Sequence, residues 1–525
     1  MAERKKQPIL VFSPFSGLPS FNAALFVISR SLIDNGENVI FISCNDSSLL
    51  PSTNATNISH SDLTYEKIDS KVTFLLDKSS SKSKLHYAFE SFVKSGNQIK
   101  EFELEGFKLG KVASYEILIN LKKLHLDESL NRDFEAIYKS VQDCITVYLL
   151  IDEICKAYDP KAIVFYNDYA IMHSAGLAAK KHGADRVLIS HASHKNVDFR
   201  KINFFYDDTF SGFKRKIESW LSWRSKPLSR EIINDVNGDL VHRLWNQMKR
   251  SHVYSKPIGE GLAFPDRFSL KEKVIVAFTS SPDEVNAGIT LNEGLGTSEN
   301  QISFTFGKNI NNCQIIWINE LVEFCKAKDY SLIIRVHPRE SLNGRSAHLD
   351  LLEKNIKAES ENVFIIWPDS EISSYDLANY ADVALTAWST IGLEFSRMGV
   401  PVIAMADGIS NIINDSFHLY ENEPKSYFRS IERLLHEKSS IENFRLAIRY
   451  WNFFALGNSV DISDLVFTSG YNGVPEYKTP KNASLISKII NKKEYVLDHN
   501  LRELCKKDER KTIGAETEAL VLAIY

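Results

Sequence analysis

The sequence predicts an α/β protein with two Rossmann-like domains that face each other across a cleft. Strands and helices alternate near the N-terminus and again at 161–190, and a second alternating block begins at residue 273. Strand, helix and strand of these lengths form βαβ units, which imply parallel sheets. The chain length of 525 residues also favours at least two domains.

The first half begins with an apolar run at 8–15, which predicts a buried strand. Apolar residues at helical spacing follow at 21–32, and this helix is expected to end near Asn35 and Gly36, which favour turns. The next expected elements, in chain order, are a strand at 38–43, a helix at 128–158, a strand at 161–166, a helix at 170–182 and a strand at 186–190.

The second block opens with a predicted strand at 274–281 and a polar, Gly- and Asn-rich loop from 283 to about 312. Further alternation follows, with a helix at 315–327, strands at 331–336 and 363–367, a helix at 374–380, and strands at 383–387 and 400–403. Ligands bind outside the carboxyl ends of the strands in such sheets, so the residues after each strand are the candidates for chemistry.

The expected domains are 1–265 and 266–470, followed by a polar helical tail at 471–525. Residues 200–265 carry tryptophans among basic side chains, which favours amphipathic connecting helices. Contact of this segment with a membrane surface or an acceptor is the alternative.

Composition excludes several classes of protein. The 63 basic and 67 acidic residues argue against a dedicated nucleic-acid binder, which usually has a basic excess. The six cysteines form no CxxC pair, so neither a zinc site nor a redox motif is indicated. The uncharged segment before Ser29 is broken by Pro14, Gly17 and Pro19, which disfavours a signal peptide or membrane span. We expect a cytoplasmic protein without a metal or cofactor.

The stretch ALTAWSTIGLEFSRMGVPVI at 384–403 leaves a buried strand and enters a helix through Ser389, Thr390 and Gly392. The first amides of a helix lack intrahelical partners and carry the positive end of its dipole. Together with two hydroxyls, they predict a phosphate site that Gly392 leaves open. Simple capping by Ser389 or Thr390 is an equally weighted alternative. Glu394 is expected to bond a ribose hydroxyl or only to lie near the dipole.

Two other strands of the second block end in polar side chains. Arg335 and His337 lie on one side of their strand, where they favour charge-assisted bonds to phosphate. A satisfied structural histidine is the alternative for His337. Ligand contacts are also expected, against the alternative of a capped loop, from three residues that follow the first strand of the block, namely Ser280, Ser281 and Glu284.

In the first domain, polar residues follow two predicted strands at Asn167, Asp168 and His191. A group-transfer reaction needs a base near the acceptor hydroxyl, and Asp168 is the preferred candidate. Taken singly, Asp168 is more often a loop residue that caps the next helix. Asn167 and His191 are placed on the acceptor side, and no acidic or cysteine partner near His191 indicates a metal.

The motifs of the second block form a series: TSSPDE at 279–284, RVHP at 335–338, SSYDLANYADV at 373–383, STIGLE at 389–394 and GVPVI at 399–403. Over roughly residues 270–410 this series resembles bacterial capsule and surface-polysaccharide biosynthesis proteins, which are similar to GT-B glycosyltransferases. The HP element with a downstream Ser-Thr pair is also similar to bacterial sialyltransferases and Kdo transferases. In those families these residues meet the nucleotide phosphate, which implies this role for His337, Ser389 and Thr390. The Asp/Glu-Asp/Glu-Gly base motif of the sialyltransferases has no clear counterpart.

The resemblance implies a metal-independent glycosyltransferase. It would move a sugar from a nucleotide-sugar, with a cytidine donor favoured, to a glycan or lipid-linked acceptor in capsule or lipopolysaccharide O-antigen synthesis. Its partners would be donor and acceptor but not nucleic acid, and peripheral contact with the inner membrane is left open. The alternatives are a nucleotide-sugar 2-epimerase or polyol-phosphate transferase of the same fold, and a non-catalytic scaffold of a polysaccharide assembly complex.

Overall fold

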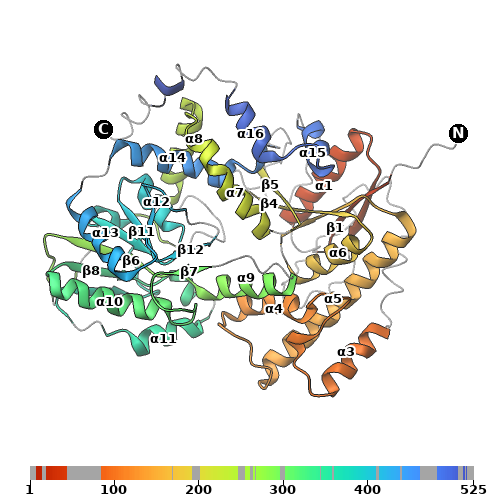
Figure 1. The fold of residues 1–525 in the computed structure, drawn as a ribbon, viewed down its shortest axis with the longest axis horizontal. Coiled ribbons are helices and arrows are strands. Elements are labelled where there is room, and N and C mark those ends of the chain that lie inside the picture. The colour runs from red at the N-terminus through yellow and green to blue at the C-terminus, as the bar shows by residue number, and fades with distance from the viewer. Residues whose placement is uncertain are drawn as a thin grey trace.

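Two parallel-stranded sheets, each covered by helices, organise the described part of the chain (Figure 1). The structure is a computed structural model. It describes residues 7–14, 19–43, 84–167, 169–191, 201–207, 209–245, 255–259, 264–266, 268–295, 302–342, 344–357, 360–409, 413–437, 440–461, 482–505, 512–514 and 516.

The first sheet has the strand order β14-β5-β4-β3-β1-β2. Its strands are β1 (Ile9–Ser13), β2 (Val39–Ser43), β3 (Ala162–Tyr166), β4 (Asp185–His191), β5 (Lys201–Tyr206) and β14 (Ser459–Asp461). Strands β1 to β4 run parallel, whereas β5 is antiparallel to its neighbours β4 and β14.

Alternation along the strands covers both faces of the first sheet. Leu10 and Phe12 of β1 pack with residues of α5 (Asn131–Tyr158) and α6 (Ala170–Lys181). Ile9 and Val11 pack on the other face with α1 (Pro19–Asp34) and α15 (Ala483–Ile490). The outer helix α3 (Lys84–Lys94) contributes Phe89 to the α5 side of the core. Helices on both faces explain why the strands are nearly continuous apolar runs.

The second sheet is entirely parallel, with the order β13-β11-β10-β6-β8-β9. Its strands are β6 (Val274–Phe278), β8 (Ser331–Arg335), β9 (Val363–Ile366), β10 (Val383–Thr386), β11 (Val402–Ala404) and β13 (Leu419–Tyr420). Numbered within the sheet, this is the doubly wound order 3-2-1-4-5-6. The order reverses between β6 and β10.

Helices cover both faces of the second sheet as well. One face packs with α10 (Cys313–Lys328), α11 (Ala347–Asn355) and α13 (Pro424–His436). The other face packs with α12 (Ile391–Arg397). A two-stranded ribbon of β7 (Ser303–Phe304) and β12 (Ala406–Asp407) lies beside the sheet. The predicted α/β fold with two parallel-sheet domains is therefore confirmed.

Three predicted segments differ from the structure. The loop expected at 283–312 is wrong over its first part, because α9 (Pro282–Leu295) begins directly after the β6 turn. The helix expected at 374–380 is a 3₁₀ turn at Asp376–Asn379. Within 200–265 the expected helices form, as α7 (Thr209–Arg224) and α8 (Arg230–Leu244), but strand β5 precedes them and was not predicted.

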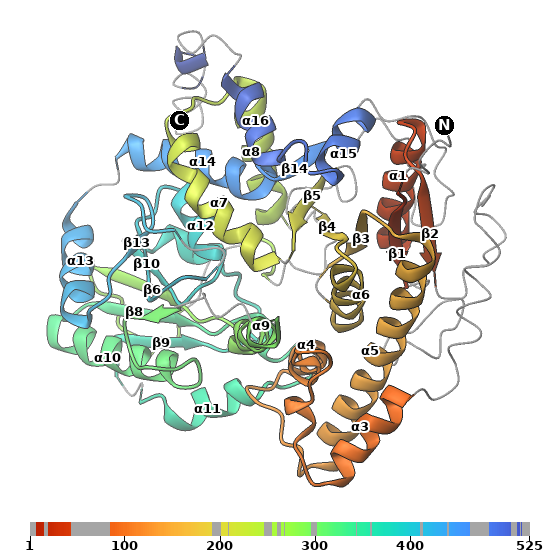
Figure 2. The same cartoon turned by 45° about the vertical axis from the view of Figure 1, so that its right-hand side comes forward.

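The two bodies meet along α4 (Leu109–Leu121) of the first and α9 of the second, which lie side by side in Figure 2. Gly294 permits this approach, since a Cβ there would lie 2.9 Å from Val112 Cγ2 and 3.0 Å from Val112 N. Lys111 Nζ and Glu293 Oε2 form an ion pair at 2.6 Å across the same contact. The Gly and Asn residues of α9 have low helix propensity, and packing against α4 stabilises the helix despite them.

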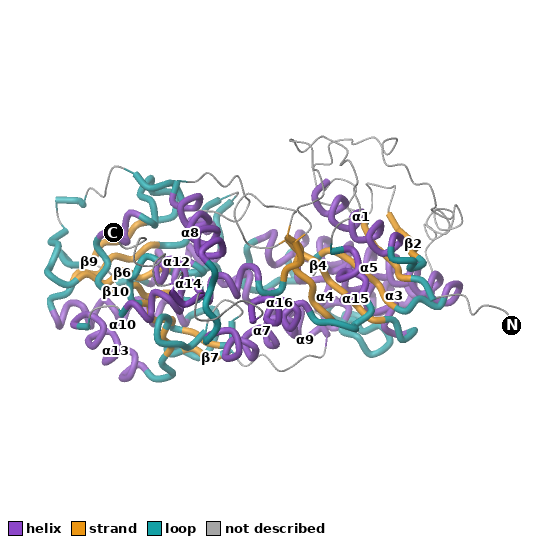
Figure 3. The backbone as a smooth tube through the Cα atoms, turned by 90° about the horizontal axis from the view of Figure 1, so that it is seen from above, coloured by secondary structure: helices purple, strands orange, loops and turns teal. Residues whose placement is uncertain are grey.

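The chain crosses between the bodies more often than the division 1–265, 266–470 and 471–525 predicts. Trp220 and Trp223 of α7 pack with α14 (Ile441–Leu456) beside the second sheet. After α14 the chain returns, because β14 pairs with β5 and α15 packs on α1. Helix α16 (Val496–Cys505) follows, and Figure 3 shows α7 and α16 in the middle of the molecule, between the two sheets.

Among the described residues, no helix is both long and apolar enough to cross a lipid bilayer. The same residues include no group of three or more His, Cys, Asp or Glu side chains arranged to hold a metal ion. The described cysteines are all free thiols.

Candidate functional site

The carboxyl ends of the neighbouring strands β6, β8 and β10 enclose a pocket in the second body. Its lining residues are Arg243, Ser255, Phe278, Thr279, Arg335, His337, Pro338, Ser374, Tyr375, Ser389, Thr390, Ile391 and Glu394. The empty space is about 500 Å³ with the solvent at its mouth included. The pocket lies where the strand order reverses, which is where ligands bind in doubly wound sheets.

The turn after β8 fixes the position and tautomer of His337. Its backbone N–H donates to Thr279 Oγ1 at 2.9 Å, which joins the ends of β8 and β6. Its ring Nδ1 accepts the backbone N–H of Arg339 at 3.2 Å, at the beginning of the 3₁₀ turn Pro338–Glu340. Because Nδ1 is the acceptor, the neutral ring carries its proton on Nε2. The imidazole is therefore a hydrogen-bond donor through Nε2.

Burial lowers the pKa of His337 to about 4. The carboxylate of Glu340 acts in the opposite direction, whereas three neighbouring cations, Arg339, Arg335 and Lys122, add to the lowering. The ring is consequently neutral at pH 7. At that pH His337 can offer an Nε2–H bond to an oxyanion but adds no positive charge.

Arg335, at the end of β8, is a buried cation in the wall of the pocket. Its guanidinium donates to the carbonyl of Trp367 at 2.6 Å and to Ser374 Oγ at 3.4 Å. Burial lowers the pKa of Arg335 to about 10, so it remains charged at neutral pH. Among the described residues, no carboxylate lies within ion-pair distance of it. A buried charge without a counter-ion is costly, and an anionic ligand would supply that counter-ion.

The Ser389–Thr390 corner joins β10 to α12. The N–H of Ile391 reaches Ser389 Oγ at 3.4 Å, and the N–H groups of Gly392 and Leu393 donate to the carbonyls of Ser389 and Thr390 at 3.2 and 3.0 Å. The expectation of unpaired amides is therefore wrong for these three groups, and α12 has only seven residues. Both hydroxyl side chains are half-buried and line the pocket. Within the described chain, no acceptor takes the Thr390 N–H.

Gly392 serves packing rather than ligand approach. A Cβ at this position would lie 2.9 Å from His418 Nε2, 2.9 Å from Thr386 Cγ2 and 3.2 Å from Val402 Cγ1. All three atoms belong to the interior of the second body, between the sheet and α12. The substrate contact expected at Gly392 is contradicted, because its missing side chain faces the protein core.

Glu394 lines the pocket, but its carboxylate is already engaged. The Tyr375 hydroxyl donates to Oε2 at 2.7 Å, and Arg243 Nη1 lies 3.4 Å from Oε1. Burial raises the pKa of Glu394, and Arg243 opposes that change. Glu394 therefore holds Arg243 and Tyr375 in the pocket wall, and its contact with a ribose hydroxyl stays a prediction.

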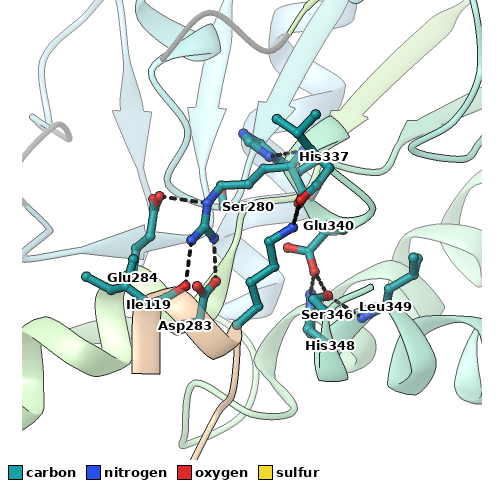
Figure 4. Close-up of polar contacts among 12 residues, drawn as sticks. Ile119, Ser280, Asp283, Glu284, His337, Glu340, Ser346, His348 and Leu349 are labelled. Carbon is teal, nitrogen blue, oxygen red and sulfur yellow. Dashed lines mark hydrogen bonds and ion pairs between the residues drawn. The ribbon is translucent and has the colours of Figure 1, made fainter. Parts of the chain in front are cut away.

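The residues predicted after β6 lie beside the pocket, not in its lining. Ser280 joins two strand ends, because its Oγ accepts the Trp388 N–H at 3.2 Å. Ser281 is buried with no hydrogen-bond partner for its Oγ in the described chain. Glu284 forms an ion pair with Arg339 at 3.2 Å (Figure 4). These three side chains do not line the pocket, whereas Thr279 of the same segment does.

The acceptor-side predictions remain predictions. Asn167 follows β3 in the left-handed conformation, with φ of 63°, and does not line the pocket. Asp168 lies outside the described residues, as does the side chain of His191 at the end of β4.

Several lining residues escaped prediction. Ser374 and Tyr375 stand within the motif at 373–383, which was noted only for its resemblance. Ser255 and Arg243 come from the segment 200–265, which carries no motif. Arg243 reaches the pocket because α8 packs beside α12, a contact between distant parts of the chain that no local pattern indicates.

The sequence matches no family profile, and no curated protein matches it. Among solved structures, the beta Kdo 2,4 transferase KpsC of Thermosulfurimonas dismutans aligns with 12% identity over 55% of this chain and 79% of that chain, with a TM-score of 0.32. The UDP-GlcNAc 2-epimerase of Methanocaldococcus jannaschii aligns with 11% identity, 84% and 97% coverage and a TM-score of 0.30. That of Neisseria meningitidis aligns with 11% identity, 86% and 96% coverage and a TM-score of 0.28. Likeness this distant says nothing about the activity of this chain.

Proposed function

We propose that this chain is a nucleotide-sugar enzyme of the GT-B type, and that it acts as a glycosyltransferase in the synthesis of a bacterial surface polysaccharide. The observation that carries the proposal is the single pocket lined by His337, Ser389 and Thr390. These are the residues that meet nucleotide phosphate in the families that the motifs resemble. Their meeting at the switch point of a doubly wound sheet supports the same role here.

The charge of the pocket suits a phosphate group. Arg335 supplies a buried positive charge that lacks a carboxylate partner in the described chain, and His337 supplies an Nε2–H donor. Ser389 and Thr390, which follow β10, add two hydroxyl side chains to the same lining. During transfer these groups would stabilise the negative charge that develops on the departing nucleotide. The chain thus offers its own cation for that purpose.

The acceptor hydroxyl needs a base from the first body. Asp168 keeps this role in the proposal. Glu116 of α4 is a second candidate, because burial raises its pKa to about 7 and it accepts the backbone N–H of Ala170, two residues after Asp168. A base with that pKa is half deprotonated near neutral pH, which suits proton abstraction. Asp168→Asn and Glu116→Gln would separate the two, because only loss of the true base removes the rise of kcat with pH.

A binding screen tests the donor site. Thermal shift and calorimetry with CMP, UDP and GDP are expected to identify at least one nucleotide that stabilises the protein. His337→Ala should abolish that shift, whereas His337→Gln should retain part of it, because the Gln amide can donate from a position close to Nε2. Failure of every nucleotide to bind would overturn the proposal and favour the scaffold alternative.

Product analysis separates the enzyme classes. The protein is incubated with the nucleotide-sugar whose nucleotide binds best, with and without added glycan. A glycosyltransferase forms a new glycoside only with the acceptor. A 2-epimerase forms the epimer or free sugar without it, and a polyol-phosphate transferase leaves nucleotide-sugars unchanged. Either of the last two outcomes would contradict the glycosyltransferase assignment.

A further inference from the structure

Lys122, which follows α4 of the first body, holds a turn of the second body. Its ammonium donates to the carbonyl oxygens of Arg339 at 2.6 Å and Gly344 at 2.9 Å, and to that of Leu342. Three acceptors match the three protons of an ammonium group. Lys122 is buried and takes the left-handed conformation with φ of 48°, which ends α4.

The turn that Lys122 holds is the one that orients His337. Arg339 donates its backbone N–H to His337 Nδ1, and the carbonyl of the same residue accepts from Lys122. The Arg339 side chain is held as well, by Asp283 at 2.8 Å and by the Ile119 carbonyl of α4 at 3.4 Å. The first body therefore contacts both the backbone carbonyl and the side chain of Arg339, the residue whose N–H sets the tautomer of His337.

These contacts are separate from the packing that joins the bodies. The α4–α9 contact already includes the Gly294–Val112 approach and the Lys111–Glu293 ion pair, which lie along the helices. The three hydrogen bonds of the Lys122 ammonium instead end on the carbonyls of Arg339, Leu342 and Gly344. Burial, followed by repulsion from Arg339, lowers the pKa of Lys122. Burying an ammonium group costs desolvation free energy, so we infer that Lys122 does more than add one contact between the two bodies.

We propose that Lys122 is a positioning residue for the donor pocket, which makes the orientation of His337 depend on the docking of the first body. This inference rests on the proposed nucleotide site. Because binding coupling is reciprocal, a phosphate bound at His337 would also favour the docked arrangement of the bodies. The acceptor-side body and the donor site would then be linked through one ammonium group.

Lys122→Met removes the three bonds while it keeps the aliphatic chain, and Lys111→Met is the matched control on the same helix. Calorimetry with UDP and with CMP is expected to show a loss of about tenfold or more in affinity for Lys122→Met, because a misoriented His337 no longer donates its hydrogen bond to the charged phosphate. Lys111→Met should bind as the original protein does. Lys122→Arg, which keeps the charge and several donors, should recover part of the affinity.

A second readout follows His337 itself in the absence of nucleotide. In protein with ¹⁵N-labelled histidine, the His337 signal is assigned by its loss in His337→Gln. Lys122→Met is expected to weaken the Nε2–H tautomer and to raise the pKa of His337, since a nearby cation is removed. Lys111→Met should leave both unchanged. This measurement tests the coupling even if UDP, CMP and GDP all fail to bind, a result that would overturn only the proposed function.

An unchanged His337 signal in folded Lys122→Met, with unchanged affinity for both nucleotides, would overturn the inference. Circular dichroism establishes that each variant is folded. Should Lys122→Met not fold, Lys122→Gln, which retains one donor without the charge, takes its place with the same two readouts. Equal effects of the Lys111 and Lys122 variants would also overturn it, because they would show general loosening of the interface.

Discussion

At the scale of single residues, the charge of Arg335 explains more about the pocket than any motif. Its guanidinium is buried and charged at neutral pH, and among the described residues it bonds only to neutral acceptors, the carbonyls of Ile366 and Trp367 and the hydroxyl of Ser374. Arg243, by contrast, contacts Asp239 and Glu394. Asp369 raises the pKa of Arg335 without forming an ion pair with it, so a direct counter-ion for Arg335 would have to come from a ligand.

Replacing Arg335 with Met should therefore lower nucleotide affinity by about tenfold or more, since a charge-assisted bond contributes roughly 1.5–3 kcal/mol. Arg433→Met, on the exposed side of α13, is the matched control and should bind normally. Calorimetry with the nucleotide found in the screen measures both. Equal affinity of the two variants would show that the phosphate does not meet Arg335.

The hydroxyl of Thr390 gives a second test. Thr390→Val keeps the shape of the side chain and removes its donor, so nucleotide affinity should fall about three- to tenfold, as expected for one neutral hydrogen bond. Thr290→Val on α9 removes a half-buried hydroxyl far from the pocket lining and should leave affinity unchanged. An unaltered dissociation constant for Thr390→Val would remove this residue from the site.

Gly392→Ala tests the packing role of this glycine. The added Cβ meets His418, Thr386 and Val402 inside the second body, and overpacking of this kind costs about 1–3 kcal/mol. Urea denaturation should show that loss of stability. Gly514→Ala is the control, because a Cβ there meets nothing within 4 Å. If the two alanines were equally well tolerated, the core at α12 would be looser than described.

Sequence patterns pointed to Arg335, His337, Ser389 and Thr390, which all line the pocket, because they stand at or a few residues beyond the ends of β8 and β10. The same patterns could not show which way the bare face of Gly392 points. The direction depends on packing against His418, which lies 26 residues later in the sequence than Gly392. Arg243 was beyond prediction for the same reason, since it reaches the pocket only through tertiary packing.

At the scale of elements, α9 is the main departure from prediction. Its glycines and asparagines disfavour an isolated helix, yet Gly294 is what allows α4 to approach. The buried strands were easier to predict, because each is a short apolar run covered on both faces. Strand β5 was not predicted from the sequence. Its burial pattern is neither a continuous buried run nor a strict alternation, and its partner β14 comes from far along the chain.

A double-mutant cycle tests the α4–α9 contact. Gly294→Ala places a methyl group 2.9 Å from Val112 Cγ2, so it should destabilise the protein despite the better helix propensity of alanine. Val112→Ala removes that methyl contact. The double variant should be more stable than the sum of the single effects predicts, by about 0.5–3 kcal/mol. Additive effects in urea denaturation would indicate that the helices lie farther apart.

At the scale of the whole molecule, acid sensitivity follows from His418. Its Nδ1 contacts the Ile413 carbonyl, and burial lowers the pKa of His418 to about 4. The unfolded chain would bind a proton below about pH 6.5, while the folded chain would not until about pH 4. Stability is therefore full above pH 6.5 and falls as the pH drops through this window.

The expected slope is about 1.4 kcal/mol per pH unit between these limits. His418→Asn, which keeps a donor for the Ile413 carbonyl, should lack this contribution. Urea denaturation of both proteins at pH 7, 6 and 5 gives the difference. Parallel pH profiles for the two proteins would show that folding leaves the pKa of His418 close to its value in the unfolded chain.

The return of β14 to the first sheet also constrains biosynthesis. When the ribosome has made only the first half, β5 has a neighbour on one side and a bare row of peptide N–H and C=O groups on the other, and such edges invite pairing with other chains. The strand that closes this edge is among the last segments to be translated. The nascent protein must therefore shield the open edge of β5 while the second body is being synthesised. Expressing the two bodies as separate chains would also leave this edge open, because β14 would then be on the other chain.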